Sequence, residues 1–378
     1  MKTIHIFNIW AAIVLLIAGC SQKEEEVVSV NFEAAEADFE SQVASIELLP
    51  LQRDPQLRMG YAPSLYAFGD DWLLLERDPM AEPDFRTCKL YRYDNEGRFL
   101  NAIGRKGDRL DELFRIDNLQ FRDGNVIVFS LEPAGGGEKA ITYDATGHVL
   151  SAQHFEFAGG QSLLMEDGIL TYYGHGDRRG REGRLMRYFP EGLMRQAFMT
   201  ERTAPINVKS RADVLYPTKK GVVVIDTFSD TLWRYNAGKL QPYLVMDLGE
   251  HVMGDEFFAI EDMREGAQYF RSRPFAMVNR YLESGTTRLV ELSVQTADRK
   301  HICLYGYDGG RSWRWFRAAV PFEGAIQLLD GPQAICLLEP AQLSLMSDSL
   351  CSRITNPEVL SGIAPEDNYV IARISFKE

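Results

Sequence analysis

Histidine is scarce in this chain and is not grouped. There are six histidines among 378 residues, and none forms an HxxxH or HxH pair. The GxSxG, HExxH, phosphate-loop and EF-hand patterns are also missing. These absences remove the sequence grounds for a zinc peptidase, an α/β-type serine hydrolase, a P-loop nucleotidase and an EF-hand sensor. No catalytic residue is predicted.

Positive charge and long apolar runs are in short supply too. The chain has 41 Lys and Arg against 54 Asp and Glu, a net charge of −13, which disfavours nonspecific binding to nucleic acid. One apolar run, Ile6–Ile17, stands out, and its 12 residues fall short of the roughly 20 that span a bilayer. A permanent transmembrane helix is therefore the weaker interpretation of the N-terminus.

The N-terminal 20 residues have the form of a secretory signal that ends in a cysteine. Lys2 precedes the apolar run, and small Ala18 and Gly19 precede Cys20. The segment Leu16–Cys20 resembles the bacterial lipobox, which implies that residues 1–19 are removed and Cys20 is lipidated. The prediction is a lipid anchor at Cys20, a flexible tether over 20–40 and a domain over 41–378.

The residues after Cys20 indicate in which membrane, and on which side of it, the lipid is anchored. Lys23 is followed by three glutamates, which resembles the signal that sends lipoproteins to the surface of the outer membrane in some Gram-negative groups. We expect an outer-membrane lipoprotein at the cell surface, with the periplasmic face of that membrane as the alternative.

A hairpin module recurs along the chain. Segments 90–100, 141–150, 185–193, 232–240 and 304–313 each alternate apolar and polar residues around a turn, usually with Asp or Asn and then Gly. Gly supplies positive φ in these turns, and Asp or Asn tolerates left-handed backbone. Further strand pairs with their own turns precede most of them, so each module predicts a four-stranded sheet.

Modules are expected at 60–103, 114–157, 160–200, 210–249, 274–320 and 325–376. Radial repetition of four-stranded sheets is typical of a β-propeller, so the fold class is all-β with six blades. The strand at 43–49 is expected to pair with a terminal blade and close the ring. Spacings of three and four between apolar residues over 254–273 predict a short helical insertion between blades four and five.

Three further segments carry a resemblance to a known family, namely Gly97–Gly107, Asp226–Tyr235 and Pro365–Val370. They resemble the six-bladed NHL-like or TolB-like β-propeller lipoproteins of Gram-negative bacteria. The family commonly continues with a Gly-Pro-Gly-Glu-like loop, where this chain has Asp108–Phe114. The resemblance implies the fold, and function is left open because propellers host enzymes, sugar binders and scaffolds.

Candidate ligand-binding residues come from surface aromatics and from a basic loop. Trp313 and Trp315 share one strand face and could stack on sugar rings or pack between blades. His175 is expected to look into solvent or the channel, and Arg178 and Arg179 could grip an anionic partner or lie in a solvated loop. No cofactor is predicted, with calcium bound by blade-turn acids as the alternative.

Cysteine pairing stays open at this stage. Beyond Cys20 the chain has Cys88, Cys303, Cys336 and Cys351, without CxxC spacing. Cys336 and Cys351 could form a disulfide, or all four could be buried free thiols.

The sequence favours a noncatalytic lipoprotein. Its propeller is expected to bind a glycan or an envelope protein, with the membrane contacted through the N-terminal lipid. The alternative is a metal-dependent hydrolase or lyase of the NHL-like propeller type, which needs channel-facing carboxylates and Asn or His around one point.

Overall fold

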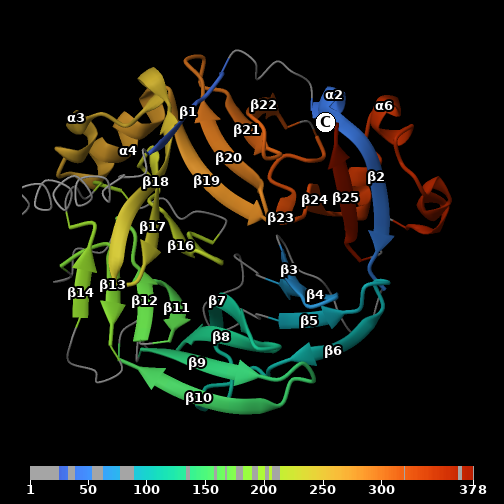
Figure 1. Cartoon of the computed structure of the whole chain (residues 1–378), viewed down its shortest axis with the longest axis horizontal. Coiled ribbons are helices and arrows are strands. Elements are labelled where there is room, and N and C mark those ends of the chain that lie inside the picture. The colour runs from blue at the N-terminus through green and yellow to red at the C-terminus, as the bar shows by residue number, and fades with distance from the viewer. Residues whose placement is uncertain are drawn as a thin grey trace, which may run out of the picture.

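Antiparallel sheets follow one another along the chain and form a ring in the computed structural model (Figure 1). The structure describes residues 25–32, 39–52, 63–76, 89–132, 137–156, 160–166, 168–175, 182–189, 195–200, 204–206, 213–318, 320–364 and 368–377. Each sheet is one blade, and the strands nearest the ring axis are β3, β7, β11, β15, β19 and β23. The predicted all-β fold with six blades is confirmed.

The strands of the first three blades are as follows. Blade one contains β3 (Ser64–Phe68), β4 (Asp71–Glu76), β5 (Lys89–Tyr93) and β6 (Phe99–Ile103). Blade two contains β7 (Arg115–Arg122), β8 (Asn125–Leu131), β9 (Glu138–Tyr143) and β10 (Val149–Phe155). Blade three contains β11 (Gln161–Met165), β12 (Gly168–Tyr172), β13 (Leu185–Tyr188) and β14 (Arg195–Phe198).

The last three blades complete the ring. Blade four contains β15 (Leu215–Thr218), β16 (Gly221–Ile225), β17 (Thr231–Asn236) and β18 (Lys239–Asp247). Blade five contains β19 (Phe275–Ser284), β20 (Thr287–Gln295), β21 (His301–Asp308) and β22 (Trp313–Arg317). Blade six contains β23 (Ile326–Asp330), β24 (Gln333–Leu338), β25 (Val370–Phe376) and β2 (Val43–Pro50).

The second strand of a blade is the most apolar because both of its faces are covered. Residues 126–130 of β8 and 222–225 of β16 are all buried. A sheet packed on both faces takes near-continuous apolar runs rather than alternation. The core therefore lies between adjacent blades, as the cluster that joins Leu170, Val223 and Leu292 shows.

Hairpin turns use Asp and Gly in different ways. Asp94 Oδ1 accepts hydrogen bonds from the amides of Glu96 at 3.0 Å and Arg98 at 2.8 Å, and Asp144 does the same in blade two. Gly97 takes φ +78°, and a Cβ there would lie 2.5 Å from the Pro50 carbonyl oxygen. The positive φ in these two turns falls on Gly97 and Gly147, as the sequence predicted, and not on Asp94 or Asp144.

The ring is closed by β2, as the sequence predicted. Its residues pair antiparallel with β25 from Val43–Phe376 to Pro50–Val370. Val43, Ile46 and Leu48 are buried in blade six. Closure lets the face of blade six pack on that of blade one, as the cluster of Leu65, Ile335 and Ile371 shows.

The segment 20–40, expected as a flexible tether, contains secondary structure. Strand β1 (Glu26–Ser29) adds in parallel to β18 as a fifth strand of blade four (Figure 1). Helix α2 (Phe39–Gln42) leads into β2, and Phe39 is fully buried. The expectation overlooked the alternation of Val28 and its neighbours, which gives β1 one buried side chain.

The helical insertion between blades four and five is confirmed, in pieces. It comprises η3 (Gly249–His251), α3 (Asp255–Phe258) and α4 (Met263–Ser272). Asp262 caps α4 by accepting hydrogen bonds from the amides of Arg264 and Glu265. Because of this cap, α4 begins as a new helix after α3. Phe257 of α3 is fully buried against Phe228 and Phe275.

Short helices also lie inside blade six, where none was expected. They are α5 (Pro340–Leu343), α6 (Asp348–Cys351) and η4 (Pro357–Gly362), between β24 and β25. Leu343 and Leu350 are buried in the blade-six core. Among the described residues, no helix has the length and hydrophobicity needed to cross a bilayer.

Candidate functional site

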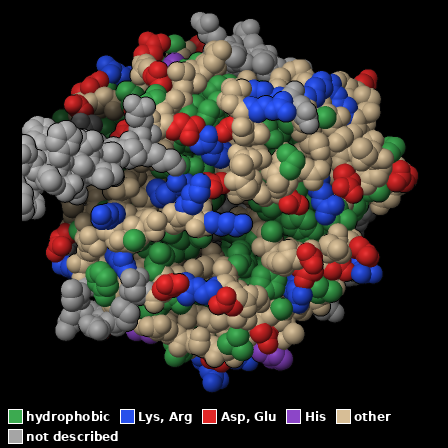
Figure 2. Space-filling model, viewed as in Figure 1, with side chains coloured by type: hydrophobic (Ala, Val, Ile, Leu, Met, Phe, Trp, Pro, Cys, Tyr) green, Lys and Arg blue, Asp and Glu red, His purple; other side chains and the backbone are tan. Residues whose placement is uncertain are grey.

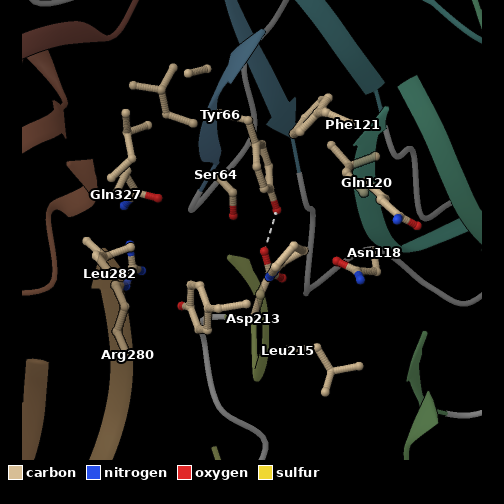
Figure 3. Close-up of a pocket in the computed structure, with 16 residues that line it drawn as sticks. Ser64, Tyr66, Asn118, Gln120, Phe121, Asp213, Leu215, Arg280, Leu282 and Gln327 are labelled. Atoms are coloured by element: carbon tan, nitrogen blue, oxygen red, sulfur yellow. Dashed lines mark hydrogen bonds between the residues drawn. The ribbon is translucent and has the colours of Figure 1, made fainter. Parts of the chain in front are cut away.

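A cavity of about 300 Å³ lies among the inner strands of the propeller (Figure 3). Inner strands of five blades contribute to it, from β3, β7, β15, β19 and β23. The lining residues are Ser64, Leu65, Tyr66, Ala67, Asn118, Leu119, Gln120, Phe121, Asp213, Leu215, Tyr216, Pro217, Arg280, Leu282, Gln327 and Leu328. Residues far apart in sequence thus meet at the ring axis, which is the usual place for a ligand in this architecture.

One hydrogen bond crosses this channel. Tyr66 in β3 of blade one donates its hydroxyl to Asp213 Oδ2 at 3.1 Å, and Asp213 lies just before β15 of blade four (Figure 3). Blades one and four stand opposite each other in the ring (Figure 1). The contact places a carboxylate and a phenol ring together in the middle of the cavity.

Amide side chains of the lining hold adjacent blades together. Gln120 of β7 donates from Nε2 to the Leu164 carbonyl and accepts from the Leu164 amide, each at 2.8 Å. Asn118 donates from Nδ2 to the Ser162 carbonyl at 2.8 Å. These amides satisfy backbone groups at the edge of β11, so they are occupied with structure.

Arg280 brings positive charge to the opposite wall. It is 8% exposed, and its Nη1 donates to the Ile326 carbonyl of blade six. Its Nε lies 4.0 Å from Glu291 Oε2, and Glu291 is buried as well. Burial acts to lower the pKa of Arg280, and the charge of Glu291 outweighs it, so the pKa lies above its ordinary value.

The described lining therefore offers both charges, hydroxyls, an amide and aromatic rings. Asp213 and Arg280 supply the charges, and Gln327 supplies the amide. None of the lining residues is His or Cys, so a nucleophile with an adjacent imidazole base is missing from this wall. The arrangement suits binding by hydrogen bonds and ring contacts.

On the face shown in Figure 2, Lys and Arg side chains lie near the middle of the ring beside hydrophobic ones.

His175 lies away from the channel, in a buried polar network. It is 2% exposed, and its Nε2 lies 2.8 Å from Asp226 Oδ1. The Ala204 amide donates to its Nδ1 at 3.1 Å, so Nε2 carries the proton that faces Asp226. The expectation that His175 looks into solvent or the channel is wrong, because Phe228 and Phe258 of the neighbouring segments cover its ring.

The same network joins blades three and four. Tyr172 donates its hydroxyl to Asp226 Oδ1 at 2.7 Å, and Arg184 Nη2 donates to Oδ2 at 2.7 Å. Burial acts to raise the pKa of Asp226, and the hydrogen bonds from His175 and Arg184 outweigh it, so this pKa is held well below its usual range. Tyr172, His175 and Asp226 are buried and Arg184 is partly buried, so the network serves to fix the loops after β12 and β16.

The tryptophan pair lies on the outermost strand of blade five. Trp313 and Trp315 stack with ring centroids 6.2 Å apart. Their indole N–H groups donate to β1, from Trp313 to Glu26 Oε1 at 3.2 Å and from Trp315 to the Ser29 carbonyl at 3.0 Å. The structure places both rings between blade five and β1, the packing alternative that the sequence left open.

The other predicted sites are placed only in part. Arg178, Arg179, Cys20 and Cys88 lie outside the described residues. Cys303, Cys336 and Cys351 are free thiols, and a Cys336–Cys351 disulfide is not formed.

The acids of the blade turns do not converge. Asp71 accepts from Arg92 Nε at 2.8 Å, and Glu112 pairs with Arg105 at 2.6 Å. In the described part of the chain, no three His, Cys, Asp or Glu side chains are grouped closely enough to hold a metal ion. The acids serve blade turns and ion pairs there.

A family model matches most of the chain. The model described as "Domain of unknown function (DUF4934)" matches residues 26–374. No curated protein matches the chain. The family match spans β1 and all six blades.

Solved structures show where the fold recurs. A "Putative exported protein" of Bacteroides fragilis is 13% identical, with a TM-score of 0.67, over 94% of this chain and 99% of that one. An exo-β-1,3-galactanase of Clostridium thermocellum has a TM-score of 0.37 at 7% identity, over 86% of this chain and 61% of that one. The propeller domain of the Trilobed protease of Pyrococcus furiosus has a TM-score of 0.35 at 9% identity, covering 69% and 82%. The first similarity shows the fold, and the other two are too weak to carry an argument.

The channel residues were not singled out from the sequence. Tyr66 and Asp213 are 147 residues apart, and no motif joins them. The usable signal was position, because both lie at the start of a module, where the inner strand of a blade begins. Polar residues in such strands are the ones to test first in a propeller.

Proposed function

We propose that this chain, which belongs to the family described as "Domain of unknown function (DUF4934)", is an exported, lipid-anchored protein whose propeller binds a sugar unit of a glycan in its central channel. The observation that carries the proposal is the cavity of about 300 Å³ lined from five blades. The proposal assigns binding and no catalysis.

The chemistry of the lining supports a sugar unit. Sugars present hydroxyls for carboxylates and amides, and apolar ring faces for aromatic side chains. Asp213 and Gln327 provide the first kind of contact, and Tyr66, Phe121 and Tyr216 provide the second. Arg280 also lies in the lining, where Glu291 and the Ile326 carbonyl already engage its guanidinium, so the lining does not select an acidic sugar.

Export and anchoring are supported by the N-terminus. The segment Leu16–Cys20 resembles a lipobox, and the similar Bacteroides fragilis protein is described as exported. We assign the lipid to Cys20 and the outer membrane as its location, with the domain at the cell surface rather than at the periplasmic face.

Labelling cells with an alkyne fatty acid tests the anchor. The wild-type chain should incorporate the label and sediment with membranes, and the Cys20→Ser variant should do neither. Protease added to intact cells should then degrade the wild-type domain if it lies at the surface. Equal labelling of both chains would contradict a lipid at Cys20.

A thermal-shift screen tests the channel. The probes are galactose, N-acetylglucosamine, galacturonic acid and glucuronic acid, with glycine and glutamate as amino-acid comparisons. We expect a neutral sugar of the panel to raise the melting temperature of the wild-type protein and to have a smaller effect on Asp213→Asn, because a carboxylate accepts stronger hydrogen bonds from sugar hydroxyls than a carboxamide does. The matched control is Asp330→Asn, which makes the same carboxylate-to-amide change at an exposed position at the end of β23. Shifts that are equal in all three proteins would exclude binding at the channel.

A further inference from the structure

Strand β1 lies against an outer edge of the propeller close to the predicted anchor. It pairs in parallel with the end of β18, from Glu26–Leu244 to Ser29–Asp247 (Figure 1). The Val30 amide continues the pairing to the Asp247 carbonyl at 3.4 Å. A four-residue strand at an edge has few hydrogen bonds, so side chains must contribute most of what holds it.

Arg288 in β20 of blade five holds the first residue of β1. Its Nη1 and Nη2 donate to Glu26 Oε2 and Oε1 at 2.6 and 2.7 Å, a two-pronged pair. Asp308 of β21 accepts from the same guanidinium at 2.6 Å and fixes its orientation. An oriented guanidinium fork recognises one carboxylate in one position.

The two tryptophans complete the slot. Trp313 donates to Glu26 Oε1, and Trp315 donates to the Ser29 carbonyl at the other end of β1. Between them Val28 is 3% exposed and packs in the core shared by blades four and five. The slot thus contacts the Glu26 carboxylate, the Val28 side chain and the Ser29 backbone carbonyl along one extended segment.

Docking of β1 changes how far the propeller can move from the lipid. Six residue steps separate Cys20 from Glu26, a reach of at most about 20 Å. With the chain held first at fully buried Phe39, nineteen steps from Cys20, the reach rises to about 65 Å. The slot lies at the rim of blades four and five, so docking also selects which rim is near the bilayer.

We propose that Arg288, Trp313 and Trp315 form a docking slot for β1 that holds the rim of blades four and five against the membrane surface. Blade one, on the opposite side of the ring, then faces away from the bilayer. The orientation part rests on the lipid anchor of the proposed function, and the slot itself does not.

Hydrogen exchange on the full lipidated chain tests the slot. Glu26→Ala removes the carboxylate that Arg288 and Trp313 hold, and the matched control Glu25→Ala changes the exposed neighbour. We expect amides of residues 27–30 to exchange about tenfold faster in Glu26→Ala than in the wild-type chain, and Glu25→Ala to behave as wild type. Equal exchange in all three chains would overturn the slot.

Energy transfer to a lipid dye tests the orientation. The lipidated chain is placed in vesicles of phosphatidylethanolamine and phosphatidylglycerol with a headgroup acceptor, and a donor is introduced at exposed Gln241 of β18 or Leu100 of β6. Transfer should be stronger from Gln241 than from Leu100, and Glu26→Ala should reduce that difference. Equal transfer from both positions in the wild-type chain would overturn the orientation.

The anchor is checked separately in the same vesicles. If Cys20 carries no lipid, energy transfer is lost from both donor positions. In a density gradient, the wild-type chain then floats with the vesicles no more than Cys20→Ser does. That result would overturn the orientation together with the anchor, while the exchange rates still decide the slot.

Discussion

Tyr66 and Asp213 meet across the axis of the propeller, with the phenol hydroxyl 3.1 Å from the carboxylate oxygen (Figure 3). One residue comes from blade one and the other precedes the inner strand of blade four. Because this contact spans the channel, closing the ring brings the two residues together and so shapes the cavity.

A double-mutant cycle measures this contact. Tyr66→Phe and Asp213→Asn each weaken the hydrogen bond, and the pair should show a coupling free energy of about 1 kcal/mol in urea unfolding. The expected sign is a double variant less destabilised than the sum of the single variants. Strict additivity would mean that the two side chains do not interact in solution.

Glu138 predicts a pH-dependent stability. It is fully buried in β9, accepts from Ser162 Oγ at 2.7 Å, and burial raises its pKa from 4.5 to about 8. Because the folded state holds the proton more tightly than the unfolded state, this contribution is fully present below pH 4.5 and is lost as pH rises through 8. The loss is on the order of a few kcal/mol.

The variant Glu138→Gln isolates that effect. Its free energy of unfolding should fall less than that of the wild-type protein between pH 5 and pH 8.5, measured by urea unfolding in matched salt. Glu166→Gln, at an exposed position before β12, should leave the wild-type slope unchanged. Parallel profiles for wild type and Glu138→Gln would contradict a neutral buried carboxyl.

Truncation separates the roles of the two N-terminal strands. A chain that begins at Asn31 lacks β1 and loses chiefly the burial of Val28, about 1.5–3 kcal/mol. A chain that begins at Leu51 also lacks β2, whose eight residues close blade six. We expect the first to melt cooperatively a few degrees lower and the second to fail to fold, as seen by circular dichroism and calorimetry. A similar melting temperature for both would refute closure by β2.

Two of the described thiols, Cys303 and Cys336, should be unreactive in the folded protein. Burial raises the pKa of Cys303 to about 12 and also raises that of fully buried Cys336. The thiolate is the reactive form, so iodoacetamide at pH 8 should leave both unmodified until urea is added. Mass spectrometry of tryptic peptides reads the result, and a Cys336–Cys351 cross-linked peptide would contradict the structure.

Much of the fold was predictable because its signals are local. The alternation in β5 and β6 and the Asp94–Gly97 turn are contained in a dozen residues, and repetition of that unit gives the blades. Closure by β2 followed from counting modules. The channel was not predictable in this way, since Tyr66 and Asp213 become neighbours only when six blades close.

Two other features were misjudged for physical reasons. The acidic residues 23–26 indicated solvent, whereas Glu26 finds a guanidinium in blade five, 262 residues away. His175 sits among glycines and polar residues, which indicated exposure, and its burial comes from Asp226 of the next blade. In both cases the partner that fixes the side chain lies on another blade.

Saturation-transfer difference NMR is the most direct test of sugar binding in the channel. At least one of the neutral sugars galactose and N-acetylglucosamine, presented to the soluble propeller, should receive saturation from the wild-type protein and from Asp330→Asn, and markedly less from Asp213→Asn. Tyr66→Phe should weaken the signal with no loss of folding. Equal saturation in wild type and Asp213→Asn, or none with any sugar of the panel, would contradict a sugar site at the axis.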